Sequence, residues 1–155
     1  MVIQESIEIY APMDTVWQVF SAMEDWHSWN TVCENCCLIR GDKMAEDTCF
    51  TFEMRPYYLP IKVAPKITKC DPGKEVIWEG SRFGVHAVHR FTFEEKQDAV
   101  VLTSIEKFEG AILWLSKLIF IPSRLHRLTR KLITAIKHRA ESCADSVAAP
   151  RAVNV

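Results

Sequence analysis

The stretch that decides the fold is residues 111–142, which read AILWLSKLIFIPSRLHRLTRKLITAIKHRAES. After Pro122 the apolar residues recur every three or four positions, as they do on one side of an α-helix: Leu125, Leu128, Leu132, Ile133 and Ile136. The other side is basic and carries Arg124, Arg127, Arg130, Lys131, Lys137 and Arg139. Because proline disfavours helical geometry at the preceding residue, we predict a break at Ile121-Pro122 and a helix that starts near Ser123.

The chain before this stretch is typical of strands. Residues Val2–Tyr10 alternate between apolar and polar side chains, which predicts a half-buried strand. Pro12 ends that strand, and two short helices are predicted to follow, one through Val16–Met23 and one over Glu24–Trp29. Six further strands are predicted between turn residues: Val32–Arg40, Thr48–Arg55, Ile61–Cys70, Glu75–Gly80, Phe83–Glu94 and Val100–Phe108.

The number of strands and helices constrains how they pack. One long helix and two short ones cannot cover both faces of a seven-stranded sheet, so the sheet must curve around the long helix and leave its other face in water. Pro65 interrupts Ile61–Cys70, which indicates an edge strand or a bulge. Residues 1–142 are predicted to form a single domain, and residues 143–155, which lack periodicity, a loose C-terminal tail.

Composition and charge are ordinary for a globular protein. Of the 155 residues, 48% are apolar and 25% are charged, and the net charge is -1, so no overall field recruits nucleic acid. Seven Lys or Arg residues and no acidic residue lie between Gly110 and Ala140. We interpret this basic stretch as the solvated side of the helix.

Nothing in the chain is typical of a signal peptide or a membrane span. The first ten residues, MVIQESIEIY, have neither a basic start nor a long apolar run. The most apolar window, Ala111–Ile121, is shorter than the roughly 20 residues that a spanning helix needs. We therefore expect a cytoplasmic protein without an integral membrane segment, whose six cysteines are reduced.

Three cysteines lie within a span of five residues: Cys33, Cys36 and Cys37. Such spacing raises the question of a zinc or redox site. A tetrahedral site needs about four ligands, and the chain has no second CxxC and no HxxxH. An extended strand would also send Cys33 and Cys36 to opposite faces. We therefore predict structural cysteines, no metal site and no cofactor, and the sequence also lacks a phosphate-binding glycine loop, a GxSxG elbow and an HExxH motif.

Several segments, taken in order, resemble one known superfamily. They are IEIYAPMDTVW (7–17), DWHSWN (25–30), VIWEG (76–80), GVHAVHRFTFEE (84–95) and IEKFEG (105–110), which runs into the terminal helix. Together they resemble the START-like, polyketide cyclase/dehydrase (SRPBCC) superfamily over Val2 to about Ser142. Thr31 stands where that family often has proline, and Ser104 where it sometimes has histidine.

The resemblance implies an α+β, helix-grip fold. In that fold a curved, seven-stranded antiparallel sheet wraps around a long C-terminal helix, with two short helices between the first two strands and a cavity between sheet and helix. Family members bind lipids, polyketides, isoprenoids or other apolar molecules in the cavity, and a minority are enzymes. In this setting Ala111–Ile121 becomes a candidate lid over the cavity mouth.

One pair of polar residues is predicted to face this cavity. Phe91 and Phe93 should point inward, so alternation along the strand brings His89 to the same face. On the next strand Glu106 shares a face with Leu102, and a turn near residues 96–98 sets it directly or diagonally across from His89. Either the pair binds the polar end of a ligand or acts as acid and base, or it is a mutually satisfied buried pair that only shapes the pocket.

The remaining candidates are apolar side chains on the inward faces. The full predicted ligand-binding set is Phe52, Met54, Trp78, His89, Phe91, Leu102, Glu106, Trp114 and Leu118. Core packing is the competing interpretation for Trp78, Trp114 and Leu118. Tyr57 and Tyr58 either flank the entrance or belong to a plain surface loop.

We interpret the chain as a protein that binds or transports a hydrophobic or amphipathic small molecule, such as a lipid, a polyketide or an isoprenoid. One alternative is an enzyme of the cyclase/dehydratase type that uses His89 and Glu106 as its weak catalytic candidates. Another is a co-chaperone-like module whose basic helix meets an acidic partner. The ligand, any reaction and the oligomeric state are left open by the sequence.

Overall fold

A computed structural model describes residues 1–41, 43–55, 60–82, 84–110 and 122–148. The helices are α1 (Met13–Ser21), the short 3-10 helix η1 (Met23–Ser28) and α3 (Pro122–Ala148). The strands are β1 (Val2–Ile9), β2 (Glu34–Arg40), β3 (Cys49–Met54), β4 (Ile61–Val63), β5 (Lys66–Asp71), β6 (Glu75–Arg82), β7 (Val85–Glu95) and β8 (Val100–Glu109).

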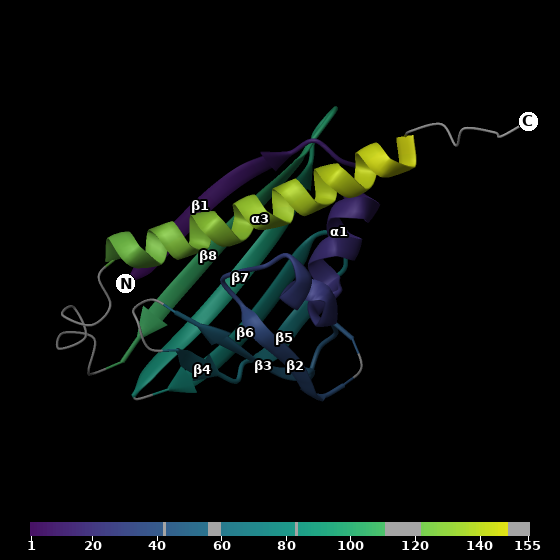
Figure 1. Cartoon of the computed structure of the whole chain (residues 1–155). Coiled ribbons are helices and arrows are strands. Elements are labelled where there is room, and N and C mark those ends of the chain that lie inside the picture. Colours follow the sequence, from purple (N-terminus) through teal and green to yellow (C-terminus); the bar gives the residue numbers. More distant parts are fainter. Residues whose placement is uncertain (42, 56–59, 83, 111–121, 149–155) are drawn as a thin grey trace, which may run out of the picture.

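The strands form one antiparallel sheet in the order β1-β8-β7-β6-β5-β3-β2, and β4 also pairs with β3. Figure 1 shows α3 lying across one face of this sheet, with α1 beside the C-terminal part of α3. The curved sheet around a long C-terminal helix confirms the predicted helix-grip architecture. Within the described residues, no helix combines the length and the apolar character needed to cross a bilayer.

The apolar stripe of α3 packs into the core as predicted. Leu132, Ile133 and Ile136 are buried in the main core cluster, and Leu128 is half-buried against it. Leu125 is buried in a second cluster, with Ile3, Val85 and Phe108. The stripe continues past its predicted end because Ala140, Cys143 and Ala144 follow at the same spacing and also pack against the core. The helix therefore runs to Ala148, and the prediction of a loose tail over residues 143–148 was wrong.

The sheet has eight strands, one more than predicted. Residues predicted as one strand over Ile61–Cys70 form β4 and β5 instead, separated at Pro65. Proline has no backbone N–H to donate and cannot continue a ladder, which explains the division. The predicted break at Ile121-Pro122 and the candidate lid over Ala111–Ile121 lie outside the described residues.

Polar contacts fasten α3 to the edge strand β1. The Glu5 carboxylate on β1 pairs with His126 Nδ1 at 2.7 Å and with Arg130 Nη2 at 3.0 Å. Further along the helix, Lys137 Nζ donates to the backbone carbonyl of Glu8 at 2.8 Å, and the backbone N–H of Tyr10 donates to Glu141 at 2.8 Å. Part of the basic side of α3 thus contacts β1, while its apolar side covers the sheet.

Glu5→Gln is expected to lower the free energy of unfolding by about 1–2 kcal/mol, because it weakens the charge-assisted hydrogen bonds from two basic partners, His126 and Arg130, which are themselves partly exposed. The hydrogen bond from His126, with help from Arg130, lowers the pKa of Glu5. This contribution is therefore present above pH 4.5, the ordinary pKa, and is lost as the carboxylate protonates at lower pH. Urea unfolding at pH 7 measures the loss in the free energy of unfolding. Glu94→Gln, on the exposed side of β7, is the control, and an equally small loss in Glu5→Gln and in this control would contradict the prediction.

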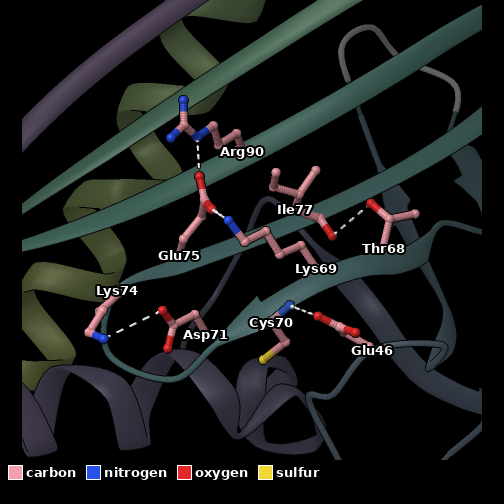
Figure 2. Close-up of polar contacts among 9 residues, drawn as sticks. All are labelled: Glu46, Thr68, Lys69, Cys70, Asp71, Lys74, Glu75, Ile77 and Arg90. Carbon is pink, nitrogen blue, oxygen red and sulfur yellow. Dashed lines mark hydrogen bonds and ion pairs between the residues drawn. The ribbon is translucent and has the colours of Figure 1, made fainter.

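The other face of the sheet is polar. Figure 2 shows the Glu75 carboxylate between Lys69 and Arg90, with which it forms ion pairs. These bonds, led by that from Lys69, lower the pKa of Glu75 although its side chain is largely covered. Lys74 pairs with Asp71 in the neighbouring turn at 3.6 Å. The face of the sheet away from α3 is thus polar, in agreement with the prediction that it faces solvent.

Candidate functional site

A cavity lies between the inner face of the sheet and α3. It has a larger lobe of about 110 Å³ and a smaller lobe of about 40 Å³. Both lobes are lined by the same five residues: Phe52, Met54, Trp78, His89 and Glu106. Because these residues border both lobes, His89 and Glu106 lie between the two spaces.

The two lobes differ in their other walls. The larger lobe extends between the ends of the strands and is further lined by Ile61, Val63, Ala64, Pro65, Gly80, Ser81, Arg82, Val85, Ala87 and Phe108. Ser81 and Arg82 are exposed, so this end is the mouth. The smaller lobe reaches α3 and is further lined by Val32, Cys33, Leu125, Leu128, Thr129 and Leu132. The predicted apolar stripe of α3 is therefore one wall of the cavity.

His89 and Glu106 are direct cross-strand partners in the β7–β8 ladder. His89 Nδ1 lies 4.0 Å from Glu106 Oε1, which is too long for a hydrogen bond. On its other side, His89 Nε2 is hydrogen-bonded to the Ser104 hydroxyl at 2.7 Å. Ser104 is fully buried and lies two residues before Glu106 on β8, so this strand supplies a hydrogen-bond partner for Nε2 and places the Glu106 carboxyl group on the side of Nδ1.

Burial controls the charge of this pair. It lowers the pKa of His89 to about 3 and raises the pKa of Glu106 to about 7. Both shifts favour the neutral form, because an apolar environment penalises the charged one. At pH 6 the site therefore holds a neutral imidazole beside a mostly protonated carboxyl group, and near pH 7 the carboxyl group begins to lose its proton.

Aromatic rings fix the position of His89. The imidazole stacks on Phe91 with ring centroids 4.1 Å apart, and it meets Trp78 edge-on at 5.3 Å. Trp78 itself packs against Phe20 and Phe50 in the core beneath the cavity. The ring orientation that presents Nδ1 toward Glu106 is therefore held by packing as well as by Ser104.

The structure brings most of the predicted site residues together. Phe52, Met54, Trp78, His89 and Glu106 line the cavity, whereas Phe91 and Leu102 are fully buried in the core and line neither lobe. Trp114, Leu118, Tyr57 and Tyr58 lie outside the described residues. The bond between Ser104 and His89 was not predicted, because it depends on the rotamer of the imidazole. Thr129, a buried hydroxyl-bearing residue within the apolar stripe of α3, was not predicted either.

The cysteines are arranged differently from the prediction. All six are free, as expected, but Cys33 and Cys36 both pack into the same core cluster rather than on opposite faces. The alternation of side chains between the two faces of the strand is interrupted between these cysteines, because Asn35 has a φ of 50° and the β2–β3 register shifts between Glu34 and Cys37.

The environment of these thiols disfavours metal or redox chemistry. Burial raises the pKa of Cys33, and it raises the pKa of Cys36 to about 12, so both thiols stay protonated at neutral pH. Among the residues that the structure describes, no group of three or more His, Cys, Asp or Glu side chains is placed to hold a metal ion.

Known structures share this architecture at low sequence identity. A protein of Thermus thermophilus superposes with a TM-score of 0.78 and 9% identity, over 93% of this chain and 99% of that one. A START superfamily protein of Mycobacterium smegmatis gives 0.68 and 10%, over 94% and 98%. The di-domain ARO/CYC StfQ of the steffimycin biosynthetic pathway gives 0.72 and 11%, over 96% of this chain and 52% of that one. These similarities establish the fold alone.

The family is established by the sequence rather than by these superpositions. A search of curated proteins gave no match. The sequence profile described as "Polyketide cyclase / dehydrase and lipid transport", in contrast, matches residues 1–141. That match covers both walls of the cavity, from β1 to the buried part of α3. The chain therefore belongs to the polyketide cyclase/dehydrase and lipid transport family.

Proposed function

We propose that this protein binds a small, largely apolar molecule in the cavity between the sheet and α3. The observation that carries the proposal is the cavity itself: an apolar space with a mouth at Ser81 and Arg82 and a buried polar pair at its centre. Such a combination of apolar walls with few polar groups is typical of small-molecule sites. The family description, which names polyketide chemistry and lipid transport, is in keeping with an apolar ligand.

The volume of the cavity indicates the size of probe to use. The larger lobe, at about 110 Å³, is of the order of the cavity of about 150 Å³ that holds one benzene molecule in a protein core. A single six-membered ring therefore fits the described space. A longer ligand would occupy both lobes and extend through the mouth.

The expected affinity follows from the buried area. One aromatic ring buries about 150–250 Å², which at about 25 cal/mol per Å² contributes roughly 5 kcal/mol before the costs of association. Before those costs are subtracted, 5 kcal/mol corresponds to a dissociation constant of about 0.2 mM, so single-ring probes should bind in the millimolar range. A natural ligand that fills both lobes should bind more tightly.

Ala87→Phe is expected to abolish binding of toluene, because the new ring projects from β7 into the larger lobe. NMR titration with toluene measures this, and Val88→Phe, which places the same ring on the opposite side of the same strand, is the matched control. Equal binding of toluene to both variants would contradict the proposal. Native mass spectrometry of protein from its own host should in addition detect a co-purifying apolar molecule.

A second candidate function is proton transfer in a cyclase or dehydratase reaction. It is favoured by one observation, the pKa of about 7 at Glu106, because an acid–base catalyst works best when its pKa is near the working pH. This candidate predicts that His89→Ala abolishes turnover of a polyketide-like substrate while the substrate still binds. If the variant loses neither turnover nor binding, the pair has no catalytic role.

A further inference from the structure

We propose that His89 and Glu106 together recognise one uncharged hydroxyl group on the ligand, which bridges the gap between the two side chains. This inference rests on the proposed binding function and adds the chemical class of the ligand: an apolar molecule, with at least one ring-sized portion, that carries a hydroxyl group. It is carried by the geometry of the pair, by its place in the cavity and by the support of the imidazole ring.

The separation of the two side chains suits one bridging oxygen atom. His89 Nδ1 and Glu106 Oε1 are 4.0 Å apart, so they do not bond each other. An oxygen atom about 2.8 Å from each completes a triangle with an angle near 90° at the oxygen, which a hydroxyl group accommodates. The pair is thus spaced for a third group between its members.

The pair is available to a ligand from both lobes. Both side chains line the larger and the smaller lobe, yet each is largely buried from solvent. Within the described part of the chain, the Ser104 bond and the 4.0 Å approach are the polar contacts found for these two side chains. A buried polar group without a hydrogen-bond partner costs free energy. A ligand that forms hydrogen bonds with both side chains should therefore bind more tightly than one that does not.

The imidazole cannot easily turn away from this position. Ser104 holds Nε2 at 2.7 Å, Phe91 stacks on one ring face and Trp78 meets the imidazole edge-on. Nδ1 is therefore kept toward Glu106 whether or not a ligand is bound. Because these side chains are already ordered before binding, little conformational entropy is lost when a ligand binds, which favours tight and selective binding.

The chemistry of the pair favours a hydroxyl over a charged group. Burial disfavours charge on both side chains, and an added carboxylate or ammonium group would have to be desolvated in the same apolar space. A hydroxyl group both donates and accepts, so it can satisfy the pair whichever member carries the proton. Among the described residues that line the two lobes, the other ionisable ones are Cys33, whose thiol stays protonated, and Arg82 at the mouth.

Phenol and toluene provide the test, because they differ only by a hydroxyl in place of a methyl group. We expect the ratio of the toluene to the phenol dissociation constant to be at least tenfold larger in the unmodified protein than in Glu106→Met. Methionine keeps the volume of the side chain and removes its hydrogen-bonding oxygens. Retained binding of toluene shows that the variant is folded, and Glu94→Gln is the surface control that should leave the ratio unchanged.

The possible outcomes separate this inference from the proposed function. If neither probe binds the unmodified protein, the cavity does not bind such ligands and both proposals fail. If both bind but the ratio is the same in Glu106→Met, binding stands and hydroxyl recognition is wrong. Benzylamine and benzoate, as charged probes, should bind at least 100-fold more weakly than phenol, and tighter binding of benzylamine would identify a cation site instead.

Discussion

Between pH 4.5 and 6.5, the free energy of unfolding of His89→Gln is expected to fall by about 2 kcal/mol relative to the unmodified protein, and that of Glu106→Gln to rise by about the same amount. The reason is that the two buried groups have opposite pH dependences that cancel when both are present. Glu106 has an ordinary pKa of 4.5 and a pKa of about 7 in the fold, and His89 has an ordinary pKa of 6.5 and a pKa of about 3 in the fold.

The direction of each effect follows from proton binding. In this range the folded protein holds a proton on Glu106 that the unfolded chain has released, so this group lowers stability as pH rises. The unfolded chain holds a proton on His89 that the folded protein excludes, so this group raises stability as pH rises. Each slope reaches about 1.4 kcal/mol per pH unit where the folded and unfolded states differ by a whole proton, and it is about half of that where the unfolded group is half-protonated.

Urea unfolding of the three proteins at pH 4.5, 5.5 and 6.5 measures these slopes. All other titrating groups are common to the three, so the difference from the unmodified protein isolates the missing residue. Glu94→Gln, which removes an exposed carboxylate, should run parallel to the unmodified protein. Parallel profiles for all four proteins would mean that neither His89 nor Glu106 is desolvated in the native state.

Phe20→Ala is expected to lower the free energy of unfolding by about 4 kcal/mol. The Phe20 ring is fully buried at the centre of an aromatic cluster beneath the cavity. It contacts Phe91 and Phe93 at 5.0 Å each, Trp26 at 5.9 Å, Trp17 at 6.1 Å and Trp78 at 6.2 Å between ring centroids. Alanine leaves a void among rigid rings that cannot close around it, which is the condition for a large cavity penalty.

Phe20→Leu is the matched variant for this prediction. Leucine fills much of the space, so a loss of about 1–2 kcal/mol is expected on urea unfolding. Similar losses for the two variants would show that the cluster relaxes around Phe20. Because Trp78 lines the cavity and packs on Phe20, Phe20→Ala should also weaken toluene binding while Phe20→Leu leaves it nearly unchanged.

The side-chain placements that the sequence predicted correctly lie on regular strands and on the long helix. The β7–β8 ladder runs from His86 to Glu95 without a register shift, so alternation and the turn near Lys96 suffice to set His89 opposite Glu106. The same regular spacing predicts the buried face of α3. In such elements the position of each side chain follows from counting residues.

The features that were not predicted lie where the regular spacing of apolar residues is interrupted or hard to recognise. Asn35 resets the alternation in β2 and brings Cys36 to the side of Cys33, and Pro65 divides one predicted strand into two. The end of α3 was missed because Ala140, Cys143 and Ala144 continue its buried stripe with small side chains that a search for large apolar residues passes over. The burial of small side chains and the positions of bulges depend on how the elements pack against one another, which cannot be deduced from a single sequence.

The pairing of β1 with β8 has a consequence for how the protein is made. Within this sheet the strand that is made first, Val2–Ile9, pairs with Val100–Lys107, which is made about 100 residues later. At about 5–20 residues per second, it waits roughly 5–20 s with Ile3, Ile7 and Ile9 uncovered. The domain therefore completes its sheet only after β8 has been made, so the apolar side chains of β1 stay uncovered until the end of synthesis of the sheet.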